Sequence, residues 1–341
     1  MSHEITIKDV AKQANVSVAT VSRVLNGLDR VSDKTRKKVQ KVVKELNYVP
    51  NTMAVSMVTK QTQMLAVVVP VFENPFYTAV IKGTVDVASR EGYHTVVFST
   101  NDSEKEEAAF FMSSLKRNVD GIVLIGAHND PEFYQSINKP VILVDRYIEG
   151  CGLDGVVIDN FRGAYESTKY LIENGHQQIA IISGPQTFND GIERYRGYQQ
   201  ALKDFEIDLV PEYFKQGDWF EHHGYQSMKE LMNLSNPPTA VFAANNMICQ
   251  GVIKAIRDLN LEIGSDISLV GFDENTLADF VKPRISVIKR PTYEMGIHAA
   301  EMLLQKLKQG EKNDSVPRKV TLGVELLKFG SVKNLGGEKN A

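Results

Sequence analysis

From residue 64 onward, short apolar runs rich in β-branched residues alternate with longer amphipathic stretches. Such runs are typical of strands buried on both faces of a parallel sheet, and the amphipathic stretches have helical length. The expected strands are residues 65–70, 94–98, 121–125, 141–144, 156–158, 179–182, 240–243 and 267–272. The expected helices are residues 76–90, 104–116, 161–174, 191–204, 223–234, 247–259 and 293–308. This order predicts a doubly wound α/β fold, with too many strands for one compact copy, so we expect two lobes.

The loops that follow these strands are rich in polar and aromatic residues. In doubly wound folds ligands bind at the carboxyl ends of the strands, where such loops meet. Carboxylates, amides and guanidinium groups beside flat aromatic rings form a pocket that suits a sugar. The loop residues in question are 72–77, 145–146, Arg194, 217–219, 245–246 and 271–273.

The first residues of the chain have a different pattern, which predicts a short helix over residues 7–15. Thr6 offers an N-cap oxygen, and Asp9 lies three residues later, as a capping box requires. One face of the helix is apolar, so it is expected to be buried while the lysines stay in water. The apolar positions are Ile7, Val10, Ala11 and Ala14.

A second helix is expected almost at once, over residues 18–25. Asn15 tolerates the left-handed backbone that a tight reversal needs, and Ser17 provides the next N-cap. Gly27 lies just beyond the expected end of this helix. Two short helices joined by a tight turn form a helix-turn-helix, and a third amphipathic stretch at residues 32–46 is expected to brace it.

Basic charge is concentrated in this N-terminal segment. Residues 1–62 carry 11 Lys+Arg against 5 Asp+Glu, whereas the remainder of the chain carries 28 against 37. A cationic small module attached to an acidic body is the pattern expected when only the module contacts nucleic-acid phosphates.

Length and composition narrow the class of protein further. A chain of 341 residues suggests two or three domains, and 43% hydrophobic with 24% charged residues is typical of folded protein. With no secretory signal and no apolar run of about 20 residues, we expect a soluble cytoplasmic protein without membrane contact. Cys151 and Cys249 lack the spacing of a zinc or redox site and are expected to be reduced. Nucleotide-binding, hydrolase and metal motifs are missing, so we expect no enzyme activity, no cofactor and no metal.

Three segments closely resemble the LacI/GalR family of transcription regulators: residues 6–26, 46–51 and 52–57, the last resembling the family's hinge helix. The body is similar to periplasmic sugar-binding proteins, and residues 74–77 with 145–146 are most similar to ribose-type binders. The resemblance implies a helix-turn-helix head at residues 1–49, a hinge helix and linker at 50–62, an effector-binding and dimerisation domain at 63–335, and a tail at 333–341. Within the body it implies a first lobe at about 63–160 and 291–320, and a second at about 161–290 and 321–332.

The resemblance also assigns DNA contacts. In this family the start of the second helix enters the major groove. Arg23 would bond a guanine bidentately, while Val18 and Ala19 would offer apolar contact to a base such as thymine. The alternatives are that Arg23 contacts phosphate and that Val18 and Ala19 only pack the helix. The residues expected on phosphates are Thr20, Ser22 and Asn26.

The hinge helices of a dimer are expected to pair in the minor groove, with Ala54 and Met57 at the DNA. Met57 stands where the family usually has Leu, and its flexible stem costs more entropy to fix, so a weaker kink is expected. Val55 stands where many relatives have Arg or Gln, which removes a hydrogen bond to the groove.

The family's effector positions fall on the loops identified above. Phe76 and Trp219 would stack on the ligand, and the polar groups would bond its hydroxyls. Arg290 departs from the Gln usual at its position, and its extra charge would favour an anionic ligand such as a sugar phosphate. The alternative is that Arg290 pairs with Asp145 or Asp273 and that the ligand is neutral. The full set of implied effector residues is Asn74, Phe76, Asp145, Arg146, Arg194, Trp219, Asn245, Asp273 and Arg290.

The resulting expectation is a homodimer that represses carbohydrate-utilisation genes by binding a palindromic operator on double-stranded DNA. A sugar or sugar derivative between the lobes would control it allosterically. The rival classes are a regulator controlled by a partner protein and, less in keeping with the motifs, a sugar-acting enzyme. A dimer is expected because residues 330–341 lack the leucine heptads of a tetramerising coiled coil.

Overall fold

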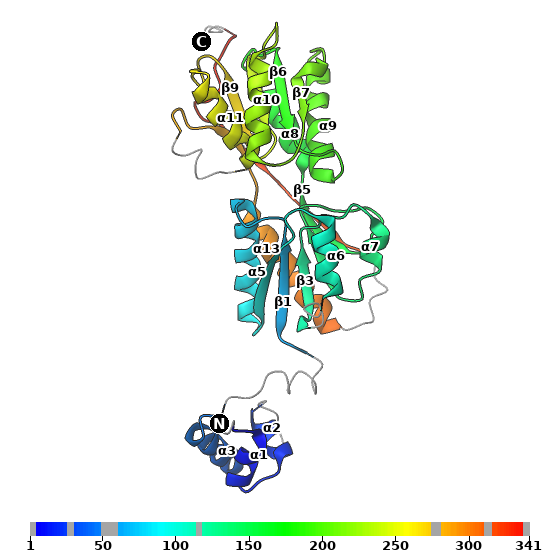
Figure 1. Cartoon of the computed structure of the whole chain (residues 1–341), viewed down its shortest axis with the longest axis vertical. Coiled ribbons are helices and arrows are strands. Elements are labelled where there is room, and N and C mark those ends of the chain that lie inside the picture. The colour runs from blue at the N-terminus through cyan, green and yellow to red at the C-terminus, as the bar shows by residue number, and fades with distance from the viewer. Residues whose placement is uncertain are drawn as a thin grey trace. The chain divides into compact units, whose positions relative to one another are not determined.

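A computed structural model of the chain describes residues 5–25, 31–48, 61–113, 118–273, 281–309 and 316–336 (Figure 1). The chain divides into two compact units, Met1–Thr62 and Gln63–Ala341. Of the helices that are described, none is long and apolar enough to cross a membrane.

The first unit contains three described helices, α1 (Ile7–Gln13), α2 (Val18–Leu25) and α3 (Asp33–Glu45). Their buried side chains form one small apolar core, composed of Val10, Ala11, Ala14, Val21, Val24, Val39 and Val42. Each helix contributes its apolar stripe to this core and leaves its polar face in water, as amphipathic periodicity predicts.

The turn between α1 and α2 is built as the sequence predicts. Asn15 has a φ of 50°, in the left-handed region that Asn tolerates. The Ser17 Oγ accepts a hydrogen bond from the Thr20 backbone N–H at 3.1 Å and thereby caps α2. At the start of α1, the Asp9 carboxylate accepts from the Thr6 backbone N–H at 2.9 Å. These local bonds set the direction in which α2 leaves the turn.

The second unit contains two six-stranded sheets with strand orders β11-β5-β4-β3-β1-β2 and β12-β10-β9-β8-β6-β7. All neighbouring strands pair in parallel except β10 and β12, which are antiparallel. The first lobe comprises β1 (Met64–Val69), α5 (Pro75–Arg90), β2 (His94–Ser99), α6 (Glu104–Met112), β3 (Gly121–Leu124), α7 (Pro131–Gln135), β4 (Val141–Val144), β5 (Asp154–Ile158), α13 (Thr292–Gln309) and β11 (Lys319–Leu322). The second comprises α8 (Asn160–Glu173), β6 (Ile179–Ser183), α9 (Asn189–Asp204), the 3₁₀ helix η2 (Pro211–Tyr213), β7 (Phe214–Gln216), α10 (Glu221–Met232), β8 (Ala240–Ala243), α11 (Asn246–Asp258), β9 (Ser268–Phe272), β10 (Ser286–Lys289) and β12 (Glu325–Leu327).

Helices cover both faces of the first sheet. Leu65, Val67 and Val69 of β1 join a core with α5 and α13, whereas Ala66 and Val68 join a separate core with α6 and α7. Figure 1 shows α5 and α6 on opposite sides of β1. Because successive side chains of a strand point to opposite faces, both faces of β1 must be apolar, which explains its continuous apolar run.

The chain passes between the two sheets three times, after β5, after β10 and after β11. All eight expected strands are present. Short strands β7, β10, β11 and β12 and the helix α7 were not expected, because these runs of three to five residues mix polar with apolar side chains and lack the continuous apolar pattern of the expected strands. The strand β11 continues to Leu322 in the first sheet, so it runs past residue 320, where we expected the first lobe to end.

The helices α5 and α13 cross at two glycines. A Cβ at Gly83 would lie 2.2 Å from the Tyr293 carbonyl oxygen, and one at Gly296 would lie 2.1 Å from the Val80 carbonyl oxygen. The two backbones are therefore in direct contact, and only residues without a Cβ fit at this crossing.

Replacing Gly296 with Ala is expected to destabilise the second unit by about 1–3 kcal/mol, because a backbone carbonyl has no room to move away from the added methyl group. Urea unfolding followed by circular dichroism measures the loss. Gly323→Ala is the matched control, since a Cβ there meets nothing within 4 Å. Equal unfolding midpoints for the two variants would contradict the close crossing.

Candidate DNA interface and candidate effector site

The helix α2 presents the residues expected at base edges to solvent. Val18 is 40% exposed, and Ala19 and Arg23 are also exposed, whereas Val21 and Val24 are buried in the core of the first unit. Exposed apolar and guanidinium side chains on one helix are available for contact with base edges in a major groove.

Of the residues expected on phosphates, Thr20 and Ser22 are half-buried on α2. The Thr20 hydroxyl forms a hydrogen bond of 2.8 Å with the Ser17 hydroxyl, so it can donate to a phosphate only when Ser17 is the donor of that bond. Asn26 and the hinge residues Ala54 and Met57 lie outside the described residues. The helix α3 adds exposed lysines to the same small unit, at positions 34, 37, 38, 41 and 44.

In the second unit, Arg290 lies at the passage from β10 to α13 and binds carboxylates from both sheets. Its Nη1 donates to the Asp145 Oδ1 at 2.8 Å and its Nη2 to the Asp273 Oδ2 at 2.7 Å. Asp145 follows β4 of the first sheet, and Asp273 follows β9 of the second. All three side chains are at least 95% buried. Burial acts to lower the pKa of Arg290, but the two carboxylates outweigh it and raise the pKa, so the group stays charged.

The two aspartates that bind Arg290 have a left-handed backbone conformation. The φ of Asp145 is 66° and that of Asp273 is 77°. Such a conformation costs a non-glycine residue of order 1 kcal/mol or more and persists where its surroundings hold it in place. The backbone at the two strand ends therefore directs the carboxylates of Asp145 and Asp273 toward Arg290.

Arg146 forms a second buried ion pair beside the first. It pairs with Asp102, with an Nη2 to Oδ2 distance of 3.1 Å, and its Nη1 donates to the Gly126 carbonyl at 3.0 Å. Its Nε lies 3.8 Å from the Asp190 Oδ2. Burial raises the pKa of the Asp190 carboxyl, and Arg146 opposes that rise. Neither Asp102 nor Asp190 was expected from the sequence, although Asp102 follows the end of β2, where such a residue was to be sought.

Arg194 is buried, and no carboxylate of the described residues lies within ion-pair distance of it. Its Nε donates to the Asn160 Oδ1 at 2.8 Å and its Nη1 to the Ala244 carbonyl at 2.6 Å. Its guanidinium lies 3.9 Å from the centre of the Phe272 ring. Burial and, next, the charge of Arg290 lower its pKa. Asn160 is a further residue of this cluster that the sequence did not reveal.

Two of the expected effector residues, Phe76 and Asn245, already form contacts within the protein. The Arg290 guanidinium covers the Phe76 ring at 3.8 Å. The Asn245 Oδ1 caps α11 by accepting from the Ile248 N–H at 2.7 Å, and its Nδ2 donates to the Trp219 carbonyl at 3.0 Å. Phe76 and Asn245 thus position their neighbours, and Asn245 fixes the backbone that carries Trp219.

A cavity of about 530 Å³ lies between the loops of the two sheets. From the expected set it is lined by Asn74 and Trp219 only. The expected charged residues Asp145, Arg146, Arg194, Asp273 and Arg290 belong to the ionic cluster, and Asp102, which pairs with Arg146, also lines the cavity. The other lining residues are Pro70, Val71, Glu73, Tyr77, Asn101, Phe220, Glu221, His222 and Met247.

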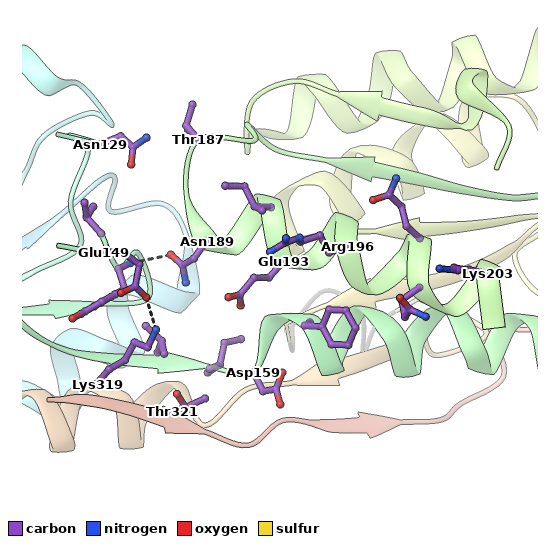
Figure 2. A pocket seen from close by; sticks show the side chains of 18 residues that line it. Asn129, Glu149, Asp159, Thr187, Asn189, Glu193, Arg196, Lys203, Lys319 and Thr321 are labelled. Atoms are coloured by element: carbon purple, nitrogen blue, oxygen red, sulfur yellow. Dashed lines mark hydrogen bonds and ion pairs between the residues drawn. The ribbon is translucent and has the colours of Figure 1, made fainter. Parts of the chain in front are cut away.

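A second groove of about 920 Å³ is lined by residues of both lobes (Figure 2). Lys319 pairs with Glu149 at 2.6 Å across one end of it. Asn189 joins the lobes at its floor, since its Oδ1 accepts from the Tyr147 N–H at 2.9 Å and its Nδ2 donates to the Asp145 carbonyl at 3.1 Å. Because Tyr147 and Asn189 are the chain neighbours of Arg146 and Asp190, this groove lies next to the ionic cluster.

Comparisons with known proteins agree with this architecture. Residues 6–51 match the family described as bacterial regulatory proteins, lacI family, and residues 168–328 match the periplasmic binding protein-like domain. The HTH-type transcriptional regulator RegA of Clostridium saccharobutylicum is 34% identical over 314 residues, which cover 91% of this chain and 94% of RegA.

Two solved structures are similar over nearly the whole chain. A lac repressor dimer bound to operator and the anti-inducer ONPF has a TM-score of 0.84 and 27% identity, covering 97% of this chain and 100% of that chain. A complex of the transcriptional regulator CelR with cellobiose has a TM-score of 0.73 and 30% identity, covering 96% and 99%.

A helix-turn-helix unit joined to a two-sheet binding domain defines the class of DNA-binding transcriptional regulators, and this chain is one of them. It belongs to the lacI family of bacterial regulatory proteins. The expected fold class and family are confirmed, and the relatives are regulators, not enzymes.

Replacing Arg290 with Met is expected to destabilise the second unit by about 3–5 kcal/mol, because Asp145 and Asp273 would remain buried without their partner. Lys319→Met is the control: it removes an exposed ion pair with Glu149 and should cost about 0.5 kcal/mol or less. Denaturant unfolding of both variants tests this. Similar losses would show that burial of the Arg290 pairs is energetically unimportant.

Proposed function

We propose that this protein is a homodimeric repressor of carbohydrate-utilisation genes that acts in the cytoplasm on a palindromic operator. The exposed face of α2, on a separate cationic unit, supports operator reading by this part of the chain. The ionic cluster and cavity between the two lobes support control by a small molecule.

On DNA, Arg23 would read a guanine in each half-site, with Val18 and Ala19 in apolar contact with neighbouring bases. Thr20, Ser22 and Asn26 would hold the phosphates and fix the register of α2 in the groove. Ala54 and Met57 of the two hinge segments would enter the minor groove at the centre of the operator.

In the cleft, the distribution of charge favours a neutral effector. Among the described residues, the buried carboxylates of Asp145, Asp190 and Asp273 and the half-buried carboxylate of Asp102 face the guanidinium groups of Arg146, Arg194 and Arg290, so the acids in this cluster outnumber the bases by one. Arg146 and Arg290 are neutralised by these carboxylates, and two of the five N–H groups of Arg194 donate to an amide oxygen and a carbonyl oxygen. At Arg146 or Arg290, an anionic ligand would have to displace a carboxylate, at the cost of leaving that charge unpaired.

The pairing of Arg290 with Asp145 and Asp273 argues against the anionic ligand that the additional positive charge of Arg290 had suggested. A sugar's hydroxyl groups donate to carboxylates and accept from amides without adding charge. Asn74, Asp102 and Trp219 would be the first groups that such a ligand meets in the cavity.

The variant Arg23→Ala is expected to bind the protein's own operator, selected from random duplexes, about 10- to 100-fold more weakly per half-site, because a bidentate guanine contact is lost. Affinity for unselected duplex should change little. Fluorescence anisotropy at one fixed salt concentration measures both. Lys41→Ala, on the exposed face of α3, is the comparison for general loss of charge. Equal losses on the two duplexes would assign Arg23 to phosphate instead.

A thermal-shift panel tests the effector. Neutral sugars such as ribose and cellobiose are compared with gluconate and ribose 5-phosphate, and a neutral member is expected to raise the melting temperature by mass action. Stabilisation by an anionic sugar alone would refute the charge argument. No response to any member, together with operator binding, would favour control by a partner protein.

A further inference from the structure

Two asparagine amides join the lobes at the edge of the 530 Å³ cavity. The Asn246 Nδ2, at the start of α11 in the second lobe, donates to the Asn74 Oδ1, at the N-cap of α5 in the first lobe, over 2.7 Å. Asn74 is 7% exposed and Asn246 is 1% exposed. Asn74 lines the cavity, and so does Met247, the neighbour of Asn246.

The direction of this hydrogen bond is fixed by the two helix starts. The Asn74 Oδ1 also accepts from the Phe76 backbone N–H at 2.9 Å, and the Asn246 Oδ1 accepts from the Met247 backbone N–H at 2.8 Å. A backbone N–H only donates, so each side chain must turn its oxygen toward its own helix. With these orientations, the two atoms that lie 2.7 Å apart are the Asn246 nitrogen and the Asn74 oxygen, so in this contact Asn246 donates and Asn74 accepts.

We propose that the Asn74–Asn246 pair is a positioning contact that holds the two lobes closed over the cavity and so sets the affinity of the effector site. The proposal rests on the proposed function in one respect, namely that the effector occupies this cavity. A ligand that binds the closed arrangement gains affinity in proportion to the closed population, and by linkage anything that opens the lobes weakens its binding.

Because Asn246 donates and Asn74 accepts, we expect an Asn→Asp substitution to have different effects at the two positions. Asn246→Asp keeps the bond to the Met247 N–H but replaces the donor by a second oxygen, which faces the Asn74 Oδ1 and repels it. Asn74→Asp keeps both bonds, because a carboxylate accepts from the Phe76 N–H and from the Asn246 Nδ2. The two variants add the same charge and the same volume, so only the direction of the bond distinguishes them.

A tryptophan that lines the cavity can report whether the two lobes open. Trp219 is the chain's single tryptophan, is 8% exposed and lines the same cavity. The Asn245 Nδ2 bonds its carbonyl oxygen, so Trp219 is tied to the start of α11, next to Asn246. Quenching of its fluorescence by acrylamide reports how readily solvent reaches the cavity.

The experiment measures acrylamide quenching and the radius of gyration by small-angle X-ray scattering on the full-length protein without sugar or DNA. Asn246→Asp is expected to shift the lobes toward the open arrangement by about fivefold, as for the loss of one buried hydrogen bond. Its quenching constant and radius of gyration should both rise. Asn74→Asp should match the unsubstituted protein in both measurements, and Gln216→Glu, an exposed position on β7, controls for added charge.

Circular dichroism and the melting temperature establish that the variants are folded. If Asn246→Asp does not fold, Asn246→Ala removes the donor without adding charge and should raise both quantities. The proposal is overturned if the position-246 variant that folds matches the unsubstituted protein, or if Asn74→Asp opens the lobes as much as Asn246→Asp does. Because neither measurement involves DNA or sugar, such a result would leave the proposed function standing, and failure of the sugar panel would leave the closing contact standing.

Discussion

The second unit depends most on the buried guanidinium of Arg290. It sits where the chain passes from one sheet to the other and binds Asp145 at the end of β4 and Asp273 at the end of β9. A buried charge is tolerated only when it is paired, so the three groups must stay together once the lobes have formed. Their mutual attraction draws the carboxyl ends of both sheets to one place. The remaining polar groups, including Arg146 and Arg194, are arranged around it.

This arrangement explains why the site combines rigid and adjustable parts. The charged groups of Arg146 and Arg290 are paired with carboxylates, and the backbone at Asp145 and Asp273 has a left-handed conformation. The contacts at the cavity edge are single hydrogen bonds between neutral amides, which are weaker and less costly to break than the ion pairs. The edge contacts can therefore break and re-form without disturbing the cluster.

Much of the fold follows from local patterns. In the first unit, the turn at Asn15, the cap at Ser17 and the apolar stripes of α1 to α3 are all legible in the sequence, because each depends on residues within a few positions of one another. The strands β1 to β6 are legible as buried apolar runs. The strands β7 and β10 to β12 cannot be recognised in this way, since runs such as Phe214–Gln216 and Ser286–Lys289 mix polar with apolar residues and become strands only by pairing with a neighbour.

For the site, the sequence by itself determined which side chains stand at the carboxyl ends of buried strands, such as Asp145 after residues 141–144 and Asp273 after residues 267–272. Only the tertiary structure decided which charges pair. Arg290 was open to an anionic ligand or to an aspartate, and the three-dimensional fold placed it between two carboxylates 128 residues apart in sequence. Asp102, Asn160 and the Asn74–Asn246 contact were decided in the same way. Hydrogen bonds and ion pairs act over a few ångströms in space, and no local pattern records a partner that is distant along the chain.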